Sequence, residues 1–224
     1  MASDGSPITS IILAGGRSAR LGANKALQFL DGRSLIQWVV DCLSAFSTEI
    51  IIATADGESI PCHSPVPMKT VADSHPGKGP LSGIYSGLMA SASSAAIVVG
   101  CDMPFLSAGL LRYMLRLSVD SDAVVPVTHK GMEPLCAVYS RRCLLHIERL
   151  LAQNRLGVRH LFDLVDVRYV RDEEFDALDP GRLSLFNINS QSDLDRASGM
   201  AAATRRPRAR HDTASLPLST ASGV

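Results

Sequence analysis

The sequence has no excess of charge of either sign, because 22 Lys and Arg residues stand against 22 Asp and Glu residues. Four of these basic residues and one acidic residue lie in residues 201–224, which leaves 18 basic and 21 acidic residues, a net charge of −3, for residues 1–200. A mildly acidic body lacks the broad positive surface by which proteins hold nucleic acid. We therefore expect no nucleic-acid partner and a small ligand held by a few local charges.

Zinc-binding and membrane-spanning patterns are also missing. The histidines have no zinc-ligand spacing, and the apolar run after MASDGSPIT is too short for a signal peptide or a membrane span and has no basic segment before it. The five cysteines are scattered without a CxxC pair, at Cys42, Cys62, Cys101, Cys136 and Cys143. We expect reduced thiols in a cytoplasmic protein that has no membrane contact.

Apolar runs alternate with helical patterns along the chain. Short apolar runs predict strands at residues 9–13, 49–53, 68–72, 95–100, 122–127, 135–139, 167–170 and 183–188. Residues at helical spacing lie between most of them, and further helices are predicted from about Ser107, Cys143 and Ser192. This alternation predicts an α/β fold with a mostly parallel sheet covered on both faces, in which ligands bind at the carboxyl ends of the strands.

The chain is long enough for one sizeable domain, which we place at residues 8–200 after a flexible N-terminus of residues 1–7. From residue 201 onward Ala, Ser, Thr, Pro and Arg dominate without periodicity. This composition predicts a disordered tail over residues 201–224.

A glycine-rich segment, IILAGGRSARLGANKA, follows the first predicted strand. It is not a P-loop, because five residues separate Gly16 from Gly22 where a P-loop has four, and Lys25 lies three residues beyond Gly22. It is not a dinucleotide fingerprint either, because Gly15 and Gly16 are adjacent. Neither of the two best-known phosphate loops therefore explains it.

Paired glycines at a strand end still allow close approach of the backbone to an anion, and they expose amide groups to it. Arg17, Arg20 and Lys25 add three cations within the same segment, which suits the negative charge of a triphosphate. An ordinary surface turn with solvated Arg and Lys side chains is the alternative.

The segment resembles a nucleotidyltransferase signature, LA(A/G)Gx(S/G)xRxGxxK, in type and spacing from Leu13 through Ala14 to Lys25. Its LAGG form is similar to that of the molybdenum cofactor guanylyltransferases. Four later segments resemble that family in the expected order, and the likeness spans about residues 8–197. They are Asp73 after the third strand, Gly79-Pro80-Leu81 at a helix entry, Asp102 in CDMPF, and Asn187 with Asn189 in LFNIN, where Ser190 replaces the usual threonine.

The position of Asp102 suggests a chemical role independently of the family resemblance, because this residue follows the end of the most strand-like run in the chain. A carboxylate at this edge, beside a cationic loop, suits Mg²⁺ on a triphosphate, since Mg²⁺ needs only one or two protein oxygens besides phosphates and water. Asn189 is a candidate second ligand. Asp102 could instead cap the turn that follows it. Asn187 and Asn189, two residues apart on a predicted strand, are expected to face the same side.

The resemblance implies a Rossmann-like three-layer α/β/α nucleotidyltransferase fold with a mostly parallel mixed sheet. It implies transfer of GMP from GTP to the terminal phosphate of molybdenum-bound molybdopterin, with Mg²⁺ as cofactor and with molybdopterin-handling or molybdoenzyme-maturation proteins as partners. The catalytic residues it indicates are Lys25, Asp102 and Arg20, and Asp102 is the metal ligand. The nucleotide site it indicates comprises Leu13, Ala14, Gly15, Gly16, Arg17, Lys25, Asp73, Gly79, Pro80, Leu81 and Asp102.

Two parts of the expected site match the family pattern less well than the motifs above. The family often has an Asn soon after the second strand, where this chain has Ala53 or Thr54. Arg155 and Arg159 are expected, with Asn187 and Asn189, to contact the acceptor, and an exposed helical arginine is the alternative for either one. A cytidylyltransferase for molybdopterin or another small phosphate is the alternative activity, which Gly15 in place of alanine disfavours. A nucleotide-binding module without catalysis is the alternative of another class.

Overall fold

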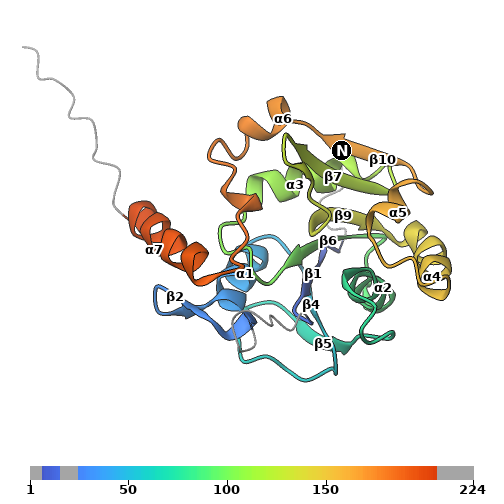
Figure 1. The fold of residues 1–224 in the computed structure, drawn as a ribbon, viewed down its shortest axis with the longest axis horizontal. Coiled ribbons are helices and arrows are strands. Elements are labelled where there is room, and N and C mark those ends of the chain that lie inside the picture. Colours follow the sequence, from blue (N-terminus) through green and yellow to red (C-terminus); the bar gives the residue numbers. More distant parts are fainter. Residues whose placement is uncertain (1–6, 16–24, 206–224) are drawn as a thin grey trace, which may run out of the picture.

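A computed structural model describes residues 7–15 and 25–205 of the chain. Its centre is an eight-stranded sheet in the order β10-β7-β9-β6-β1-β4-β5, with β8 paired to β7 (Figure 1). Among the described strands of this sheet, all pairings are parallel except those made by β9 and the short β8, so the predicted α/β class with a mostly parallel mixed sheet is confirmed. The strands are β1 Thr9–Leu13, β4 Glu49–Thr54, β5 Met68–Ala72, β6 Ala95–Gly100, β7 Ala123–Thr128, β8 Gly131–Met132, β9 Cys136–Ser140 and β10 Val167–Val170.

Successive residues of the central strands face opposite sides of the sheet, and each side is buried. Ile12, Ile50 and Ile52 pack against the apolar faces of α1 Leu35–Ser44 and α3 Ala108–Leu117. Ile11 and Ile51 pack on the other side against α2 Pro80–Ala90, α4 Leu144–Ala152 and α5 Arg159–Phe162. Helices therefore cover both faces, as the three-layer architecture predicts (Figure 1).

A close contact between α2 and β1 yields a stability prediction. A Cβ at Gly87 would lie 2.5 Å from Cγ2 of the fully buried Ile11, whereas a Cβ at Gly199 in the last helix would meet nothing within 4 Å. We expect Gly87→Ala to lower the free energy of unfolding by about 1–3 kcal/mol through overpacking, and Gly199→Ala to leave it unchanged or raise it by up to about 1 kcal/mol. Urea denaturation measures both, and equal effects in the two variants would contradict the packing argument.

The chain after β10 differs from the prediction. Residues 183–188 were expected to form a strand, and that expectation is wrong: Leu183–Leu185 is a 3-10 helix followed by irregular backbone. The buried Asp179 carboxylate accepts the amides of Leu183 and Ser184 at 3.3 and 2.8 Å, which holds the backbone in a turn rather than in a ladder. The short α6 Asp172–Asp176 precedes this turn.

The last helix, α7 Gln191–Arg205, begins near the predicted position and runs five residues past the expected boundary at residue 200. The Ser190 hydroxyl precedes it and accepts the Asp193 amide at 3.2 Å. A third apolar cluster joins α7 and the segment before it to α1 and to the hairpin of β2 Phe29–Leu30 and β3 Arg33–Ser34. Its buried members are Leu30, Leu35, Ile188 and Ala197. No helix among the described residues is long and apolar enough to span a membrane.

Candidate active site

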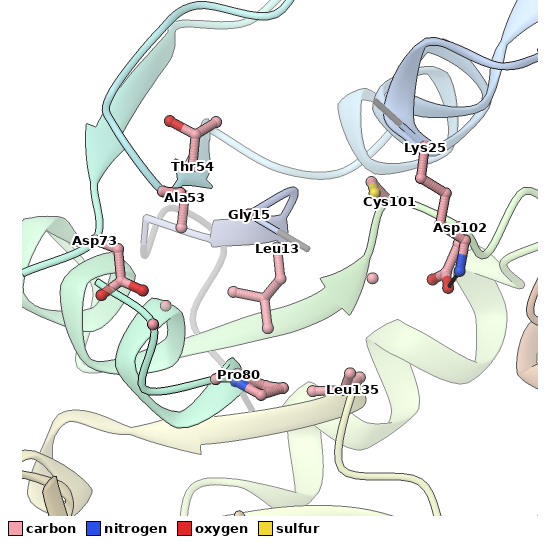
Figure 2. Close-up of a pocket in the computed structure, with 15 residues that line it drawn as sticks. Leu13, Gly15, Lys25, Ala53, Thr54, Asp73, Pro80, Cys101, Asp102 and Leu135 are labelled. Atoms are coloured by element: carbon pink, nitrogen blue, oxygen red, sulfur yellow. Dashed lines mark hydrogen bonds and ion pairs between the residues drawn. The ribbon is translucent and has the colours of Figure 1, made fainter. Parts of the chain in front are cut away.

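A cavity of about 350 Å³ lies where the carboxyl ends of β1, β4, β5 and β6 meet (Figure 2). Parallel strands bring their ends to one edge, so residues far apart in sequence gather there. Because β9 is antiparallel to β6, the residue just before β9, Leu135, reaches the same edge. The lining residues are Leu13, Gly15, Lys25, Ala53, Thr54, Ala55, Asp73, Gly77, Gly79, Pro80, Gly83, Gly100, Cys101, Asp102 and Leu135.

The entry to α2 forms one wall of this cavity. Gly79 has φ 71° and ψ −166°, a conformation open only to glycine, and no Cβ contact explains the choice of residue there. Pro80 follows as the first helical residue, where its missing N–H costs nothing. The backbone thus turns sharply into a helix whose first turn lies at the cavity, an arrangement that favours anionic ligands.

A cation and a carboxylate, those of Lys25 and Asp102, lie on the opposite side of the cavity. The Lys25 ammonium makes an ion pair with Asp102 and donates a hydrogen bond to Oδ1 of Asn189 at 2.7 Å. The Lys25 and Asp102 side chains are only 13% and 19% exposed, so solvent screens their charges less than at the surface. The Ile188 amide donates to the Asp102 carbonyl at 3.0 Å, and this bond holds the irregular segment 186–190 beside the strand end.

Cys101 lies between Asp102 and the end of β6 and also lines the cavity. Burial, and secondarily the nearby Asp102 carboxylate, raise the pKa of the Cys101 thiol to about 12. At neutral pH this sulfur is therefore a protonated thiol and a poor nucleophile. The site holds charged groups for binding an anion, but among the described residues it offers no activated thiol.

The described residues include no group of three or more His, Cys, Asp or Glu side chains that could hold a metal ion. Carboxylate and amide oxygens from Asp102 and Asn189 do converge on one cationic nitrogen, that of Lys25. Hard divalent cations such as Mg²⁺ take this kind of oxygen donor and draw their remaining ligands from phosphates and water. The donor set therefore fits a divalent cation bound together with a triphosphate.

Comparison with known proteins decides what kind of site this is. Residues 10–174 match the MobA-like NTP transferase domain family. The chain is also 37% identical over 201 residues to a molybdenum cofactor guanylyltransferase of Desulfosudis oleivorans, an alignment that covers 88% of this chain and 98% of that protein. This chain belongs to the MobA-like NTP transferase family. The resemblance drawn from its motifs is thus confirmed, and the chain is a nucleotidyltransferase.

Other relatives and solved structures support the same family assignment. A probable molybdenum cofactor guanylyltransferase of Pelotomaculum thermopropionicum is 38% identical over 200 residues, covering 89% of this chain and 96% of the relative. The crystal structure of molybdopterin-guanine dinucleotide biosynthesis protein A from Archaeoglobus fulgidus superimposes with a TM-score of 0.75 at 26% identity, over 88% of this chain and all of that one. The 2-C-methyl-D-erythritol 4-phosphate cytidylyltransferase of Thermus thermophilus, with a TM-score of 0.64 at 18% identity over 87% and 99% of the two chains, shares the fold.

In this MobA-like transferase, the first glycine of the LAGG motif, Gly15, packs closely against the backbone of the loop after β4. A Cβ at Gly15 would lie 3.3 Å from the Ala55 amide nitrogen and 3.6 Å from the Thr54 carbonyl carbon. Both atoms belong to backbone, which cannot yield as a side chain can. The 3.3 Å contact is tighter than usual, so glycine lets the loop after β4 close against the first strand end. An alanine would require the Ala55 backbone to shift by a few tenths of an ångström.

Two predicted nucleotide-site residues are in the core instead. Strand alternation turns Ala14 away from the cavity that Leu13 and Gly15 line, and its amide pairs with the Ala53 carbonyl at 2.9 Å. Leu81 is fully buried in the apolar cluster beneath α2, while Pro80 and Gly83 of the same helix reach the cavity. Gly16, Arg17 and Arg20 lie outside the described residues.

The predicted acceptor residues are spread over the molecule. Asn189 contacts Lys25, but neither Asn189 nor the half-buried Asn187 lines the cavity, and both lie in irregular backbone. Arg155 and Arg159, after α4 and at the start of α5, are exposed and also lie outside the cavity lining. Leu135 and Ala55, by contrast, were missed. The strand order that brings Leu135 to this edge has no local sequence signal.

Proposed function

We propose that this protein transfers GMP from GTP to the terminal phosphate of molybdenum-bound molybdopterin, releasing pyrophosphate and forming molybdopterin guanine dinucleotide. The observation that carries the proposal is the grouping of Lys25, Asp102 and Asn189 beside a strand-end cavity in a chain that is 37% identical to a guanylyltransferase. The cavity volume of about 350 Å³ is within the usual range for a small-molecule site.

The reaction forms one phosphorus–oxygen bond and breaks another. An oxygen of the acceptor phosphate attacks the α-phosphorus of GTP, and the bond from that phosphorus to the β-bridging oxygen breaks, so that pyrophosphate leaves with the electron pair. The attacking phosphate is already an anion, so the chemistry needs no general base. Catalysis then consists of positioning the reactants in line and stabilising negative charge.

The chain's own residues supply that positioning. Lys25 is proposed to leave its ion pair with Asp102 and stabilise the charge on the α-phosphate. The backbone amides of Gly15 and Gly16 and the Arg17 side chain are proposed to hold the β- and γ-phosphates, and Arg20 to add charge stabilisation. The Gly79-Pro80 entry to α2 and Asp73 are proposed to hold the rest of the nucleotide at the other side of the cavity.

Nucleotidyltransferases of this family generally use a divalent metal. We propose Mg²⁺ here, held by Asp102 with assistance from Asn189, because both side chains present oxygen atoms at one point of the site. When bound, this cation would neutralise phosphate charge as the leaving group departs. Asp102 would then bind the cation in place of Lys25, which frees the lysine for phosphate.

Acceptor binding by Asn187, Asn189, Arg155 and Arg159 is part of this proposal, and Asn189 is the one of the four that contacts Lys25 among the described residues. We also propose that this protein receives its acceptor from, and passes its product to, proteins that handle molybdopterin or carry out the maturation of molybdoenzymes, because the acceptor and the product are both cofactors that proteins bind.

The cytoplasmic location expected from the sequence stays a prediction. It is in keeping with the five cysteines, which are all free thiols.

Choice of base separates this proposal from the cytidylyltransferase alternative. A site built to hydrogen-bond one base rejects another by at least about 100-fold. With Mg²⁺ and molybdenum-bound molybdopterin present, we expect pyrophosphate release from GTP to exceed that from CTP by at least this factor in kcat/KM. Preference for CTP would make the protein a cytidylyltransferase, and absence of release with either nucleotide would favour a non-catalytic binding module.

A further inference from the structure

Among the described residues, the contacts that hold Asp73 at the cavity wall reach one of its two carboxylate oxygens. Its Oδ1 accepts a hydrogen bond from the Ser82 hydroxyl and a second from the His75 amide at 3.0 Å. Its own amide donates to the Thr54 carbonyl at 2.8 Å, so backbone and side chain are both fixed. Oδ2 has no hydrogen bond to any residue within 7–15 or 25–205 that the structure records, and Asp73 lines the cavity.

Ser82 is an unusual choice for the position it occupies. It stands in the first turn of α2 with a side chain that is fully buried, between Leu81 in the core and Gly83 at the cavity. A buried hydroxyl is costly unless it is hydrogen-bonded. Within the described part of the chain, the recorded partner of this hydroxyl is the Asp73 carboxylate.

We propose that Ser82 is a positioning residue that fixes the Asp73 carboxylate so that Oδ2 faces the nucleoside of the bound nucleotide. This inference rests on the proposed function, which places the nucleotide beside Asp73. The terminal carboxylate torsion is a broad, two-fold rotation, and two donors on Oδ1 restrict it. Oδ2, which has no partner among the described residues, then presents a fixed acceptor to an N–H or O–H group of the ligand. The entropic cost of ordering this carboxylate is thus met before the ligand binds.

The expected effect falls on binding more than on chemistry. Figure 2 shows Asp73 on the opposite side of the cavity from Lys25 and Asp102. A change at Ser82 should therefore weaken the hold on the nucleoside while the reacting phosphates keep their surroundings. This predicts a higher Kd and KM for the nucleotide with kcat close to that of the wild type.

Ser86 provides a matched control one turn later on the same helix. It too is a buried serine that ties α2 to the loop after β5, but its hydroxyl bonds the amide and hydroxyl of Ser74 at 2.9 and 3.0 Å and not Asp73. A purely structural role for such hydroxyls would make Ser82→Ala and Ser86→Ala equivalent. A positioning role acting through Asp73 would separate them.

The test is calorimetric titration of the full-length protein with GTP and Mg²⁺ in the absence of acceptor. We expect Ser82→Ala to raise the Kd about 5- to 10-fold, the loss of one hydrogen bond, and Ser86→Ala to change it less than about twofold. In an Asp73→Ala background, Ser82→Ala should have no further effect on the Kd.

Equal effects of the two serine variants, or a full Ser82→Ala effect that persists without the Asp73 carboxylate, would overturn the positioning role while leaving the proposed function intact. Failure of the wild-type protein to bind GTP with Mg²⁺ would instead overturn the proposed function, and this inference with it. A melting temperature for each variant shows that it is folded, so a changed Kd reports on the site.

Discussion

Replacing Lys25 with alanine should lower kcat for guanylyl transfer by about 100- to 1000-fold, the usual cost of removing one group that stabilises charge in a transition state. The reason lies in the position of the ammonium group, which is largely buried and shared between Asp102 and Asn189. No other described cation lines the cavity, so no neighbour among those residues can replace it. Steady-state release of pyrophosphate from GTP measures the change.

Lys69 supplies the control for that experiment. It is also a lysine in an ion pair, with Nζ 2.6 Å from Oε1 of Glu49, but it lies at the start of β5, at the opposite end of the strands from the cavity. We expect Lys69→Ala to keep the wild-type kcat. Both variants should keep the wild-type circular dichroism spectrum, because Lys25 belongs to a short 3-10 helix at the cavity and not to the core. Turnover of Lys25→Ala near the wild-type level would remove Lys25 from the mechanism.

The parts of the fold with regular periodicity could be predicted from the sequence. Strands β1, β5, β6 and β10 have the predicted bounds, and α1 forms where apolar residues recur at helical spacing. Strands β1 and β6 and one face of α1 are buried, so their hydrophobic pattern carries the information. The segment 183–188 was misassigned because it is a short, mostly apolar run like those of the true strands. Its residues instead form a turn held by Asp179 and a packing site for α7.

The site was predictable in so far as it depends on strand ends. Gly15, Asp73 and Asp102 all follow predicted strands, and parallel strands bring such positions to one edge. The contact between Lys25 and Asn189 joins residues 164 positions apart through an irregular segment, and no local pattern encodes it. The approach of Leu135 likewise depends on the insertion of the antiparallel β9 beside β6, which is a property of the sheet order.

Asp102→Asn should lower kcat by a similar factor of about 100–1000, for a different reason. The amide keeps the size of the side chain and an oxygen that can accept a hydrogen bond from Lys25, so the local fold should survive. It removes the negative charge, which is what makes a carboxylate a good ligand for a hard divalent cation. We therefore expect the concentration of Mg²⁺ at half-maximal activity to rise together with the loss of kcat.

Electron paramagnetic resonance measures the binding of Mn²⁺ in the presence of GTP. It therefore tests the role of Asp102 as a metal ligand separately from turnover. Asp102→Asn should weaken Mn²⁺ binding by at least about tenfold, since loss of one buried charged ligand is worth more than 1.4 kcal/mol. Asp41→Asn is the matched control, because Asp41 also pairs with a cation, Arg33 at 3.0 Å, on the exposed side of α1. If Asp102→Asn lost activity but bound Mn²⁺ as tightly as the wild type, the aspartate would act by orienting Lys25 and not by holding the metal.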